Sequence, residues 1–326
     1  MTPRGTDWTL AALVALLAAS GALTLFGGAW VFVVHDLAGF ALGGVLVWKL
    51  RRVWRRIGTR RAGLIALLLV AVTLLTGIAW SSAVTPTLFG YNPLNFHSVF
   101  GAFLAAAVLT HAAGRAKRPR RGDLTRRQVI ASAGVGVGAL ALWQLQRTPG
   151  LAGAKRRFTG SYEVASFEGN AFPCTSWVAD APKPLGDYAL VFGDRRLAAS
   201  ELDADDALTA TLDCTGGFYS TQRWRGIRLD RLLGDAPGSH VRVISDTGYR
   251  WGFDRADAPH LLLATHVGGE PLTHGHGAPV RLVAPGHRGF IWVKWVTRVE
   301  LHDGPDPGAL PSTLWSSFTP RGRGSS

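Results

Sequence analysis

The sequence predicts a molecule of two parts, an all-α bundle of transmembrane helices followed by a soluble α+β domain. The long apolar runs are confined to the first half of the 326 residues. That half also carries the excess positive charge, with a balance of +16 in residues 1–157 against −3 in the rest. From residue 158 the chain changes to short β-rich segments separated by glycine, proline and aspartate. A chain of this length has room for both parts.

Five apolar runs in the first half approach the roughly 20 residues that cross a bilayer as a helix. They are Trp8–Phe26, Val31–Leu50, Leu64–Trp80, Phe96–Thr110 and Val129–Leu145. The first four predict a four-helix transmembrane bundle over residues 1–114. Residues 115–157 then comprise a basic loop, a fifth transmembrane anchor and a linker, and residues 158–326 form the soluble domain.

Two clusters of basic residues set the predicted orientation of these helices. Residues 49–61 and 115–127 are rich in lysine and arginine, whereas Ser81–Phe96 has no charged residue. Positively charged loops stay on the cytoplasmic side of a membrane. We therefore expect a multi-pass protein of the cytoplasmic (inner) membrane, with its C-terminal domain on the periplasmic or extracellular side. Charge that flanks apolar runs in this way indicates membrane lipid, and no nucleic acid, as a partner.

The fifth run begins with a pair of arginines. The segment reads Thr125-Arg126-Arg127-Gln128-Val129, which is similar to a twin-arginine export signal retained as an anchor. The twin-arginine export machinery, which moves folded proteins, is then a partner. The alternative is that two arginines simply flank a helix.

Histidines open the second and fourth runs near the predicted outer face. His35 and His97 are each followed four residues later by a glycine, Gly39 and Gly101, on the same helix face one turn along. Small residues beside two imidazoles favour a haem b held between the two helices, with quinone as its redox partner. His111 has no histidine at the matching depth of the second run, so one haem is expected. The alternative places these histidines at the membrane interface, bonded to backbone or lipid headgroups.

Short segments of the second half alternate between strand-like and helix-like patterns. The expected strands are Tyr188–Phe192, Leu208–Asp213, Val241–Ile244, Val280–Ala284 and Trp292–Leu301. The expected helical pieces are Ala198–Leu202 and Leu229–Leu233. Together they predict a mixed α+β domain with mainly antiparallel strand pairing.

The chain has two cysteines, Cys174 and Cys214, which are too few for a disulfide framework. Cys214 ends an apolar strand-like segment and is followed by Thr215, Gly216 and Gly217. A thiolate at such a turn has an open side and nearby backbone N–H groups, which suits a soft metal ligand. A merely buried free cysteine is the alternative for Cys214, and packing is the role expected of Cys174.

A second polar segment contains His274, His276, Arg281 and Lys294 among several glycines. Arginine and lysine are the side chains that bind phosphate, one as a planar fork and the other as a point charge. A polar turn between two strands is the plain alternative. A zinc site formed by His274, His276 and His287 is a further one, although structural zinc ordinarily has four ligands.

Together these two segments resemble the sulfite oxidase family of molybdopterin oxidoreductases. The first contains Cys-Thr-Gly-Gly from Cys214 and Trp-Arg-Gly from Trp224. The second contains His-Gly-Ala-Pro-Val-Arg-Leu-Val from His276 and Lys-Trp-Val from Lys294. The resemblance covers about Gly169–Leu301. It implies a sulfite-oxidase-type molybdopterin-binding fold for the C-terminal domain and a molybdenum–molybdopterin cofactor.

The resemblance also assigns residues to that cofactor. Cys214 matches the family's molybdenum ligand, His276 and Arg281 look like the phosphate contacts, and Trp292–Lys294 match the segment that closes over the pterin. The implied pterin contacts in full are Asn170, Tyr249, His276, Arg281, Trp292, Val293 and Lys294.

Departures from the family bear on the substrate. Sulfite oxidases carry an arginine five residues after the ligand cysteine, where this chain has Tyr219, which puts an anionic sulfite in doubt. A cytochrome b5 domain is not expected, and the tail after Asp303 is too short for the family's dimerisation domain. The layout resembles bacterial relatives that include methionine-sulfoxide reductases, with the candidate haem bundle fused to the catalytic domain.

The sequence therefore predicts a membrane-anchored molybdenum oxidoreductase that transfers an oxygen atom or two electrons on the outer face. Its small-molecule substrate is expected near Tyr219 and Arg223, with electrons exchanged through the membrane haem or quinone. One alternative is a non-catalytic membrane-anchored pterin-binding or sensory module. Another keeps the enzyme and reduces the bundle to an anchor with a quinone site.

Overall fold

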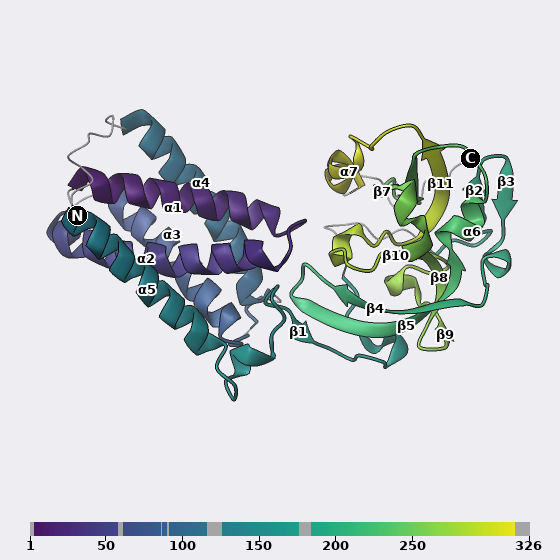
Figure 1. Ribbon diagram of the computed structural model, residues 1–326, viewed down its shortest axis with the longest axis horizontal. Helices are drawn as coiled ribbons and strands as arrows, with labels where there is room; N and C mark the ends of the chain where they lie inside the picture. Colours follow the sequence, from purple (N-terminus) through teal and green to yellow (C-terminus); the bar gives the residue numbers. More distant parts are fainter. Residues whose placement is uncertain are drawn as a thin grey trace. The chain divides into compact units, whose positions relative to one another are not determined.

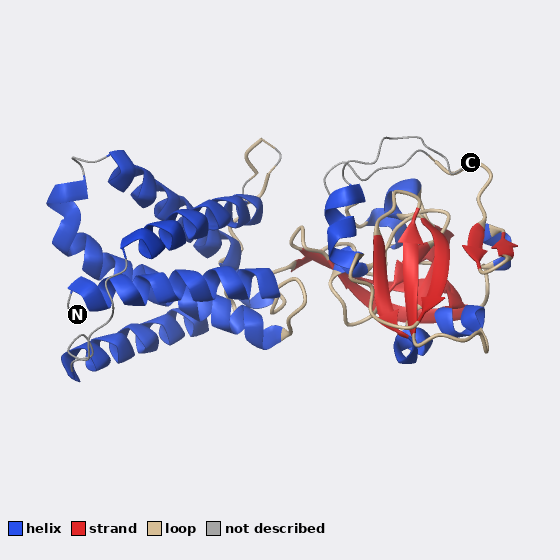
Figure 2. Ribbon diagram, turned by 90° about the horizontal axis from the view of Figure 1, so that it is seen from above, coloured by secondary structure: helices blue, strands red, loops and turns tan. Residues whose placement is uncertain are grey.

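The computed structural model describes residues 3–57, 61–85, 87–89, 91–115, 126–175 and 184–316. The chain divides into two compact units, Met1–Tyr162 and Glu163–Ser326. Figure 1 shows that the first unit is helical, and Figure 2 shows strands and short helices in the second. Most of the second basic cluster, residues 116–125, and the start of the twin-arginine segment lie outside the described residues.

Five long helices make up the first unit. They are α1 (Pro3–Leu23), α2 (Ala29–Ile57), α3 (Arg61–Ser81), α4 (Pro93–Arg115) and α5 (Arg126–Gln146). All five predicted apolar runs are thus helical, and each helix contains a stretch long and apolar enough to cross a membrane. Large apolar side chains such as Leu68, Leu75 and Phe103 are more than 60% exposed. This exposure is typical of helices that are apolar all round and face lipid.

Small and aliphatic side chains hold the helices together. α1 packs against α2 and α4, α3 packs against α4, and α5 packs against α2. Buried Leu10 of α1 meets Leu42 and Val45 of α2, and Val135 of α5 packs against this cluster. A Cβ added to Gly44 would lie 3.2 Å from the Val135 side chain, so this glycine permits the close approach of α5 to α2.

Two sheets form the frame of the second unit. In the larger sheet, the long strand β5 (Phe218–Arg228) pairs with β4 (Asp206–Asp213) along one side. Along its other side β5 pairs with β1 (Tyr162–Glu163) and β8 (Leu262–Val267). The remaining strands of this sheet, both paired with β8, are β9 (Glu270–Pro271) and β10 (Arg281–Val283).

The smaller sheet has the strand order β3, β2, β11, β6, β7. Its strands are β2 (Leu190–Phe192), β3 (Arg195–Leu197), β6 (His240–Ser245), β7 (Arg250–Asp254) and β11 (Val296–His302). β11 pairs with β2 in parallel, whereas β2–β3, β11–β6 and β6–β7 are antiparallel. Short helices and 3-10 turns connect the strands: η2 (Ala152–Lys155) before β1, then η3 (Gly169–Ala171), η4 (Ala199–Glu201), α6 (Leu229–Leu233), η5 (Arg255–His260), η6 (His274–His276), η7 (Gly289–Ile291) and α7 (Ala309–Trp315).

The sheets differ from the named strands in several places. The longer strands β5, β7 and β8 have no counterpart among them. In β5 the inward-facing positions include the polar residues Ser220 and Gln222, both fully buried. The segment expected to be extended from Trp292 becomes strand only at Val296. Trp295 adopts a φ of 51°, a left-handed conformation that interrupts an extended run.

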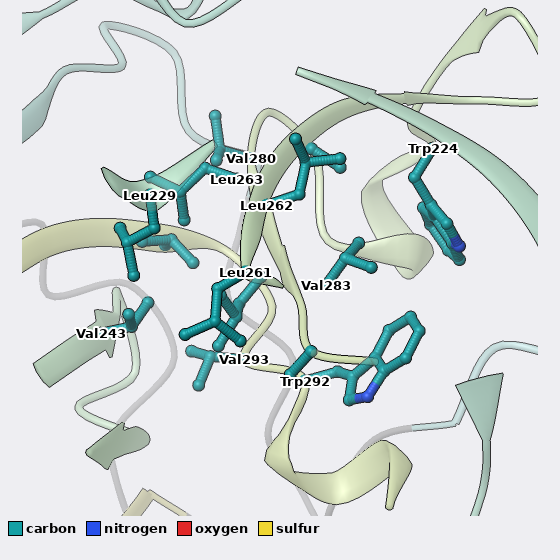
Figure 3. Close-up of a cluster of buried hydrophobic side chains, with 14 of the residues drawn as sticks. Trp224, Leu229, Val243, Leu261, Leu262, Leu263, Val280, Val283, Trp292 and Val293 are labelled. Atoms are coloured by element: carbon teal, nitrogen blue, oxygen red, sulfur yellow. The ribbon is translucent and has the colours of Figure 1, made fainter. Parts of the chain in front are cut away.

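Aliphatic and aromatic side chains from both sheets fill the core of the second unit (Figure 3). Leu262 and Leu263 of β8 and Val243 of β6 are completely buried. Trp224 and Trp292 lie at one side of this cluster, with ring centres 5.7 Å apart and at a steep angle. Truncation of a core tryptophan such as Trp224 to alanine lowers the free energy of unfolding by about 3–5 kcal/mol, so these indoles stabilise the fold.

Candidate functional site

Cys214 lies at the tip of the β4–β5 hairpin. Its backbone N–H donates to the Phe218 carbonyl at 2.8 Å, and its own carbonyl accepts from the Gly217 N–H at 3.1 Å. Gly217 has a φ of 96°, which glycine adopts without the steric cost of a side chain. The turn that follows the strand therefore holds the cysteine at a defined place.

The thiol of Cys214 is free, and the residue is 8% exposed. Its Sγ lies 3.3 Å from the Gly216 N–H, which donates to it, and 3.2 Å from the Thr175 Oγ1. A Cβ added to Gly216 would lie 3.4 Å from this sulfur. Donors next to a sulfur stabilise its thiolate form, which is the form that binds a soft metal. The arrangement suits the metal-ligand prediction for Cys214.

Arg281 on β10 is the most unusual charged residue of this region, since it is only 1% exposed. One of its amino groups donates to the His276 carbonyl at 3.0 Å, and its Nε is buried without a hydrogen-bond partner. The guanidinium lies over the rings of Trp224 and Trp292, 5.2 and 5.8 Å from their centres. A buried donor without a partner is costly, so the geometry favours an anionic group as a further partner.

The electrostatics of Arg281 support the same conclusion. Burial lowers the pKa of Arg281 to about 10, and the thiols of Cys174 and Cys214 act in the opposite direction. Within the described ranges, no carboxylate forms an ion pair with this guanidinium. A buried cation is ordinarily compensated by a paired charge, and a phosphate is a group that arginine binds as a fork.

Lys294 brings a second cation to the same place. Its Nζ donates to the carbonyls of Thr175 and Gly275, each at 2.6 Å. Gly277 between the two cations has a φ of 106°, and a Cβ there would lie 3.1 Å from the Cβ atoms of both Arg281 and Lys294. Glycine at this position therefore permits the close approach of the two basic residues.

The imidazole of His276 is buried and uses both of its nitrogens within the protein. Nδ1 lies 2.7 Å from the Thr273 hydroxyl, and Nε2 lies 2.8 Å from the Phe172 carbonyl. Burial lowers the pKa of His276, the Phe172 carbonyl raises it, and the charges of Arg281 and Lys294 lower it further. The neutral ring thus donates from Nε2 to the carbonyl and accepts the hydroxyl proton at Nδ1. Its side chain orients the segment around it.

Cys174 is exposed, so the expectation that it only packs is wrong. Its Sγ lies 3.3 Å from Nε2 and 3.5 Å from Nδ1 of His276, which places the sulfur beside the ring. Its neighbour Thr175 contacts the Cys214 thiol. The expected contact Asn170, four residues earlier, was the available signal that this stretch belongs to the site.

Comparisons with known proteins decide the family. Residues 193–310 match the family model of the oxidoreductase molybdopterin-binding domain. The second unit therefore contains an oxidoreductase molybdopterin-binding domain, and it is similar to sulfite oxidases and to methionine-sulfoxide reductase catalytic subunits. Mitochondrial sulfite oxidase from Rattus norvegicus is 38% identical over 107 residues, which are 28% of this chain and 19% of that protein. The chain therefore spans about a fifth of the length of that relative.

Two bacterial proteins extend the comparison. The protein-methionine-sulfoxide reductase catalytic subunit MsrP from Gluconobacter oxydans (strain 621H) is 28% identical over 241 residues, 62% of this chain and 75% of that protein. The solved structure of the sulfane dehydrogenase SoxCD from Paracoccus pantotrophus is 25% identical, with a TM-score of 0.34, and covers 36% of this chain and 39% of that one.

Within this molybdopterin-binding domain the structure brings some expected contacts to the Cys214 region and places others behind it. The Arg281 guanidinium lies over the Trp292 ring and interacts with both thiols, His276 contacts Cys174, and Lys294 donates to the Thr175 carbonyl. The other three expected contacts have partners within the protein. The Asn170 side chain donates to the Pro271 carbonyl at 2.9 Å and accepts from the Thr273 N–H at 3.1 Å. The Tyr249 hydroxyl donates to the Phe290 carbonyl. Val293 is completely buried, and its carbonyl accepts from the Leu282 N–H at 2.7 Å.

The two residues expected at the substrate pocket lie on the other face of the larger sheet. Side chains alternate along a strand, and Phe218 and Trp224 of β5 face the core. Tyr219 is half-buried and Arg223 is exposed, both on the opposite face of β5. Their assignment to the substrate stays a prediction, and this geometry separates them from the indole that flanks Arg281.

The zinc alternative finds no support in the part of the chain that the structure describes, which contains no group of three histidine, cysteine or acidic residues suited to a metal. His274 lies against the Trp295 ring and His287 against the Phe253 ring. The three histidines of the alternative therefore face different neighbours.

In the helical unit, the rings of His35 and His97 lie next to each other, with centres 5.9 Å apart and an interplanar angle of 85°. Nδ1 of His97 donates to the Thr73 carbonyl at 2.9 Å, and Nδ1 of His35 bonds the Ser20 hydroxyl at 3.0 Å. A Cβ added to Gly39 would meet no atom within 4 Å. The two imidazoles thus lie side by side, each with its Nδ1 in a hydrogen bond within the helical unit.

Proposed function

We propose that this chain is a membrane-anchored molybdenum-cofactor oxidoreductase whose site is built around Cys214. The observation that carries the proposal is the buried guanidinium of Arg281, with a free Nε donor, close to the Cys214 thiol. A packed core does not retain such a cation without a counterion. The cofactor of this family combines a metal for the thiolate with a phosphate for the guanidinium.

The residues of this region fit the cofactor in distinct roles. Cys214 would hold molybdenum, Arg281 and Lys294 would neutralise the pterin phosphate, and Trp292 would pack against the cofactor. His276 stays neutral, and its hydrogen bonds to the Thr273 hydroxyl and the Phe172 carbonyl hold these two segments together at the site. When bound, molybdenum supplies oxygen-atom or two-electron transfer, and the protein supplies binding, orientation and electrostatics.

An uncharged sulfoxide is the substrate class that we favour over sulfite. Tyr219 replaces the arginine of sulfite oxidases, so that cation is lost from the sequence segment that follows the ligand cysteine. The relative from Gluconobacter oxydans is named as a protein-methionine-sulfoxide reductase catalytic subunit, which agrees with this choice. The product is the sulfide, and the oxygen leaves as water after uptake of two electrons and two protons. The electrons come from the membrane side.

A haem b between α2 and α4 is the proposed source of those electrons, exchanged with quinone. A metal lies about 2 Å from a ligating imidazole nitrogen and roughly 3 Å from that ring's centre, so two rings on one iron stand roughly 6 Å apart. His35 and His97 have this separation. The Nδ1 bonds to Ser20 and Thr73 provide the outer partners that ordinarily fix a metal-bound imidazole.

The proposed setting is a cytoplasmic membrane crossed by five helices, with the catalytic domain outside. The five apolar helices and the sign of the charge between them support this arrangement. The paired Arg126 and Arg127 at the start of α5 support export through the twin-arginine machinery in the folded state. The proposed division is a bundle over 1–114, a loop and anchor over 115–157, and a catalytic domain over 158–326.

One elemental analysis tests the proposal. The full chain, purified in detergent from a host that makes molybdopterin, should contain about one molybdenum and one iron per polypeptide. Molybdenum without iron would leave the enzyme and reduce the bundle to an anchor. A folded protein with neither element would favour the rival proposal of a non-catalytic pterin-binding or sensory module.

A further inference from the structure

Among the described residues, no strand lies beside the outer edge of β4 for most of its length. In an antiparallel pair, alternate residues direct their backbone groups toward the partner strand or away from it. Cys214 bonds Phe218 across the hairpin, so the even-numbered residues of β4 face β5. Ala207, Thr209 and Thr211 consequently direct their N–H and C=O groups to the outer edge.

These outward groups have no backbone partner in the described part of the chain. β4 pairs with β5 alone, and the hydrogen bonds outside the regular elements include none from Ala207, Thr209 or Thr211. Asp213, the next outward residue, is already bridged in parallel by Arg288, with an ion pair of 2.8 Å between their side chains. The edge is therefore open from Ala207 to Thr211 and closed just before Cys214.

The open edge lacks the usual protection against pairing. Natural edge strands are blunted by lysine, proline or a bulge. Between Asp206 and Asp213 the strand reads Ala-Leu-Thr-Ala-Thr-Leu, with no charge and no proline, and its register with β5 is continuous. A regular, uncharged edge of this kind is suited to accept another extended chain.

A cavity lies along this edge. It has a volume of about 640 Å³, and its walls include Ala207, Leu208 and Thr209 on one side and Pro285 to His287 on the other. The cavity falls in the size range of ligand sites. Arg288, the residue after this lining segment, bridges to Asp213, so the cavity lies next to the open part of the edge.

We propose that the open edge of β4, from Ala207 to Thr211, binds an extended polypeptide segment and directs it toward the Cys214 end of the strand. Backbone donors and acceptors repeat at every second residue, roughly 7 Å apart, and an extended backbone has the same repeat. This inference rests on the proposed function, and it specifies how a sulfoxide carried on a polypeptide is recognised.

The register of β4 supplies a sharp test. Proline at an outward position of an edge strand removes a donor that the fold does not use, so Thr209→Pro should leave the sheet intact. Its ring then occupies the edge and its missing N–H cannot pair. Thr209→Val is the matched control, because it changes the side chain and keeps the backbone donor.

The experiment uses the full chain, purified in detergent with its cofactor, and a fluorescein-labelled unstructured peptide that contains methionine sulfoxide. Fluorescence anisotropy measures peptide binding without turnover. Thr209→Pro should weaken binding by about tenfold, since backbone hydrogen bonds are lost and the edge is obstructed. Thr209→Val should bind like the wild type, and reduction of free methionine sulfoxide should be the same in all three proteins.

A second measurement keeps the test independent of how well the proline variant folds. A peptide N-methylated at alternate residues cannot pair along an edge, and it should bind the wild type about tenfold more weakly than the parent peptide. Equal binding of the two peptides, or unchanged binding by a folded Thr209→Pro protein, overturns the proposal. A third outcome also overturns it. If the wild type is a dimer and Thr209→Pro makes it monomeric without changing peptide binding, the edge binds a second copy of the chain and not the peptide. Peptide binding without reduction of any sulfoxide would instead count against the proposed function alone.

Discussion

The helical unit and the molybdopterin-binding domain build their candidate cofactor sites in different ways. In the bundle, His35 and His97 come from two helices, and their rings hydrogen-bond Ser20 of α1 and Thr73 of α3. In the domain, Cys214 and Arg281 come from a hairpin and a distant strand of one sheet. The first site therefore depends on how several helices pack, whereas the second depends on the pairing of strands across one sheet.

The two sites also differ in the charged residues that surround them. No cation contacts the two imidazoles among the contacts that the structure describes, and the ligand proposed for them is a flat, largely apolar macrocycle. The domain site brings Arg281 and Lys294 together across Gly277, which fits an anionic ligand. The difference shows that two cofactor classes can be distinguished by which charges the fold leaves uncompensated.

The largest effect is expected from removal of the proposed metal ligand. Cys214→Ser should lower turnover by more than about 100-fold while sparing the fold, because an alcohol is a far poorer soft-metal ligand than a thiolate. Cys174→Ser is the matched control and should retain molybdenum. Metal per polypeptide and the far-ultraviolet circular dichroism of both variants provide the measurement. Turnover by Cys214→Ser with molybdenum still bound would falsify the assignment.

Next in size is the loss of haem from the bundle. His35→Ala and His97→Ala should each remove the b-type Soret band and reduce iron from about one per chain to near zero, because one imidazole seldom retains a six-coordinate haem. His111→Ala should keep both. Molybdenum content should be unchanged in all three proteins, which separates the two sites. A full Soret band in both His35→Ala and His97→Ala would mean that these histidines do not bind haem. It would favour the alternative that they lie at the membrane interface, bonded to backbone or lipid headgroups.

Arg281→Met should have opposite effects on cofactor binding and on the stability of the cofactor-free protein. The phosphate loses a charge-assisted partner, so molybdenum content should fall by about tenfold or more. Without cofactor, an apolar side chain of similar length relieves the burial of an uncompensated cation, and the unfolding temperature should rise by roughly 2–4 °C. Calorimetry on protein from a host that lacks molybdopterin measures the second effect. A lower unfolding temperature would mean that the guanidinium is already satisfied within the protein.

The smallest expected effect is a pH dependence from His276. Its pKa in the folded protein is lowered, first by burial, so the unfolded chain binds more protons just below the ordinary value of 6.5. The stability that the neutral His276 ring contributes to the folded protein is fully present above that pH. It is lost as the pH falls through the lower pKa of the folded state. His276→Asn should therefore reduce the decline of the unfolding temperature between about pH 7 and pH 5. An unchanged decline would assign it to other groups.

Sequence reasoning was most successful where short-range pattern determines structure. The five apolar runs are helices, and the strands at Leu208–Asp213 and Val241–Ile244 lie within β4 and β6. The position of Cys214 at the end of a strand, before the turn Thr-Gly-Gly, was also predicted and is confirmed, because it is the first residue after β4; its role as a ligand stays a prediction. These features depend on periodicity and on local turn chemistry, both of which are legible in neighbouring residues.

Sequence reasoning failed where the partner of a residue lies far along the chain. Nothing local shows that Cys174 lies against His276, about one hundred residues away, or that Gln222 is buried and bonds the Ala165 carbonyl. The placement of Tyr219 on the outer face of β5 likewise depends on the register with β4. Such contacts arise only when the strands pair.

The sequence by itself determined the order of the parts, the five helices, the sign and position of the charge, and the identity of the ligand candidates. Hydrophobic periodicity and charge act over a few residues, so they can be read directly. Only the tertiary structure decided that Arg281 is buried with a free donor, that His276 is neutral and already bonded, and that the edge of β4 is open. Burial, protonation and strand pairing depend on what surrounds a group, and those surroundings are assembled from distant segments.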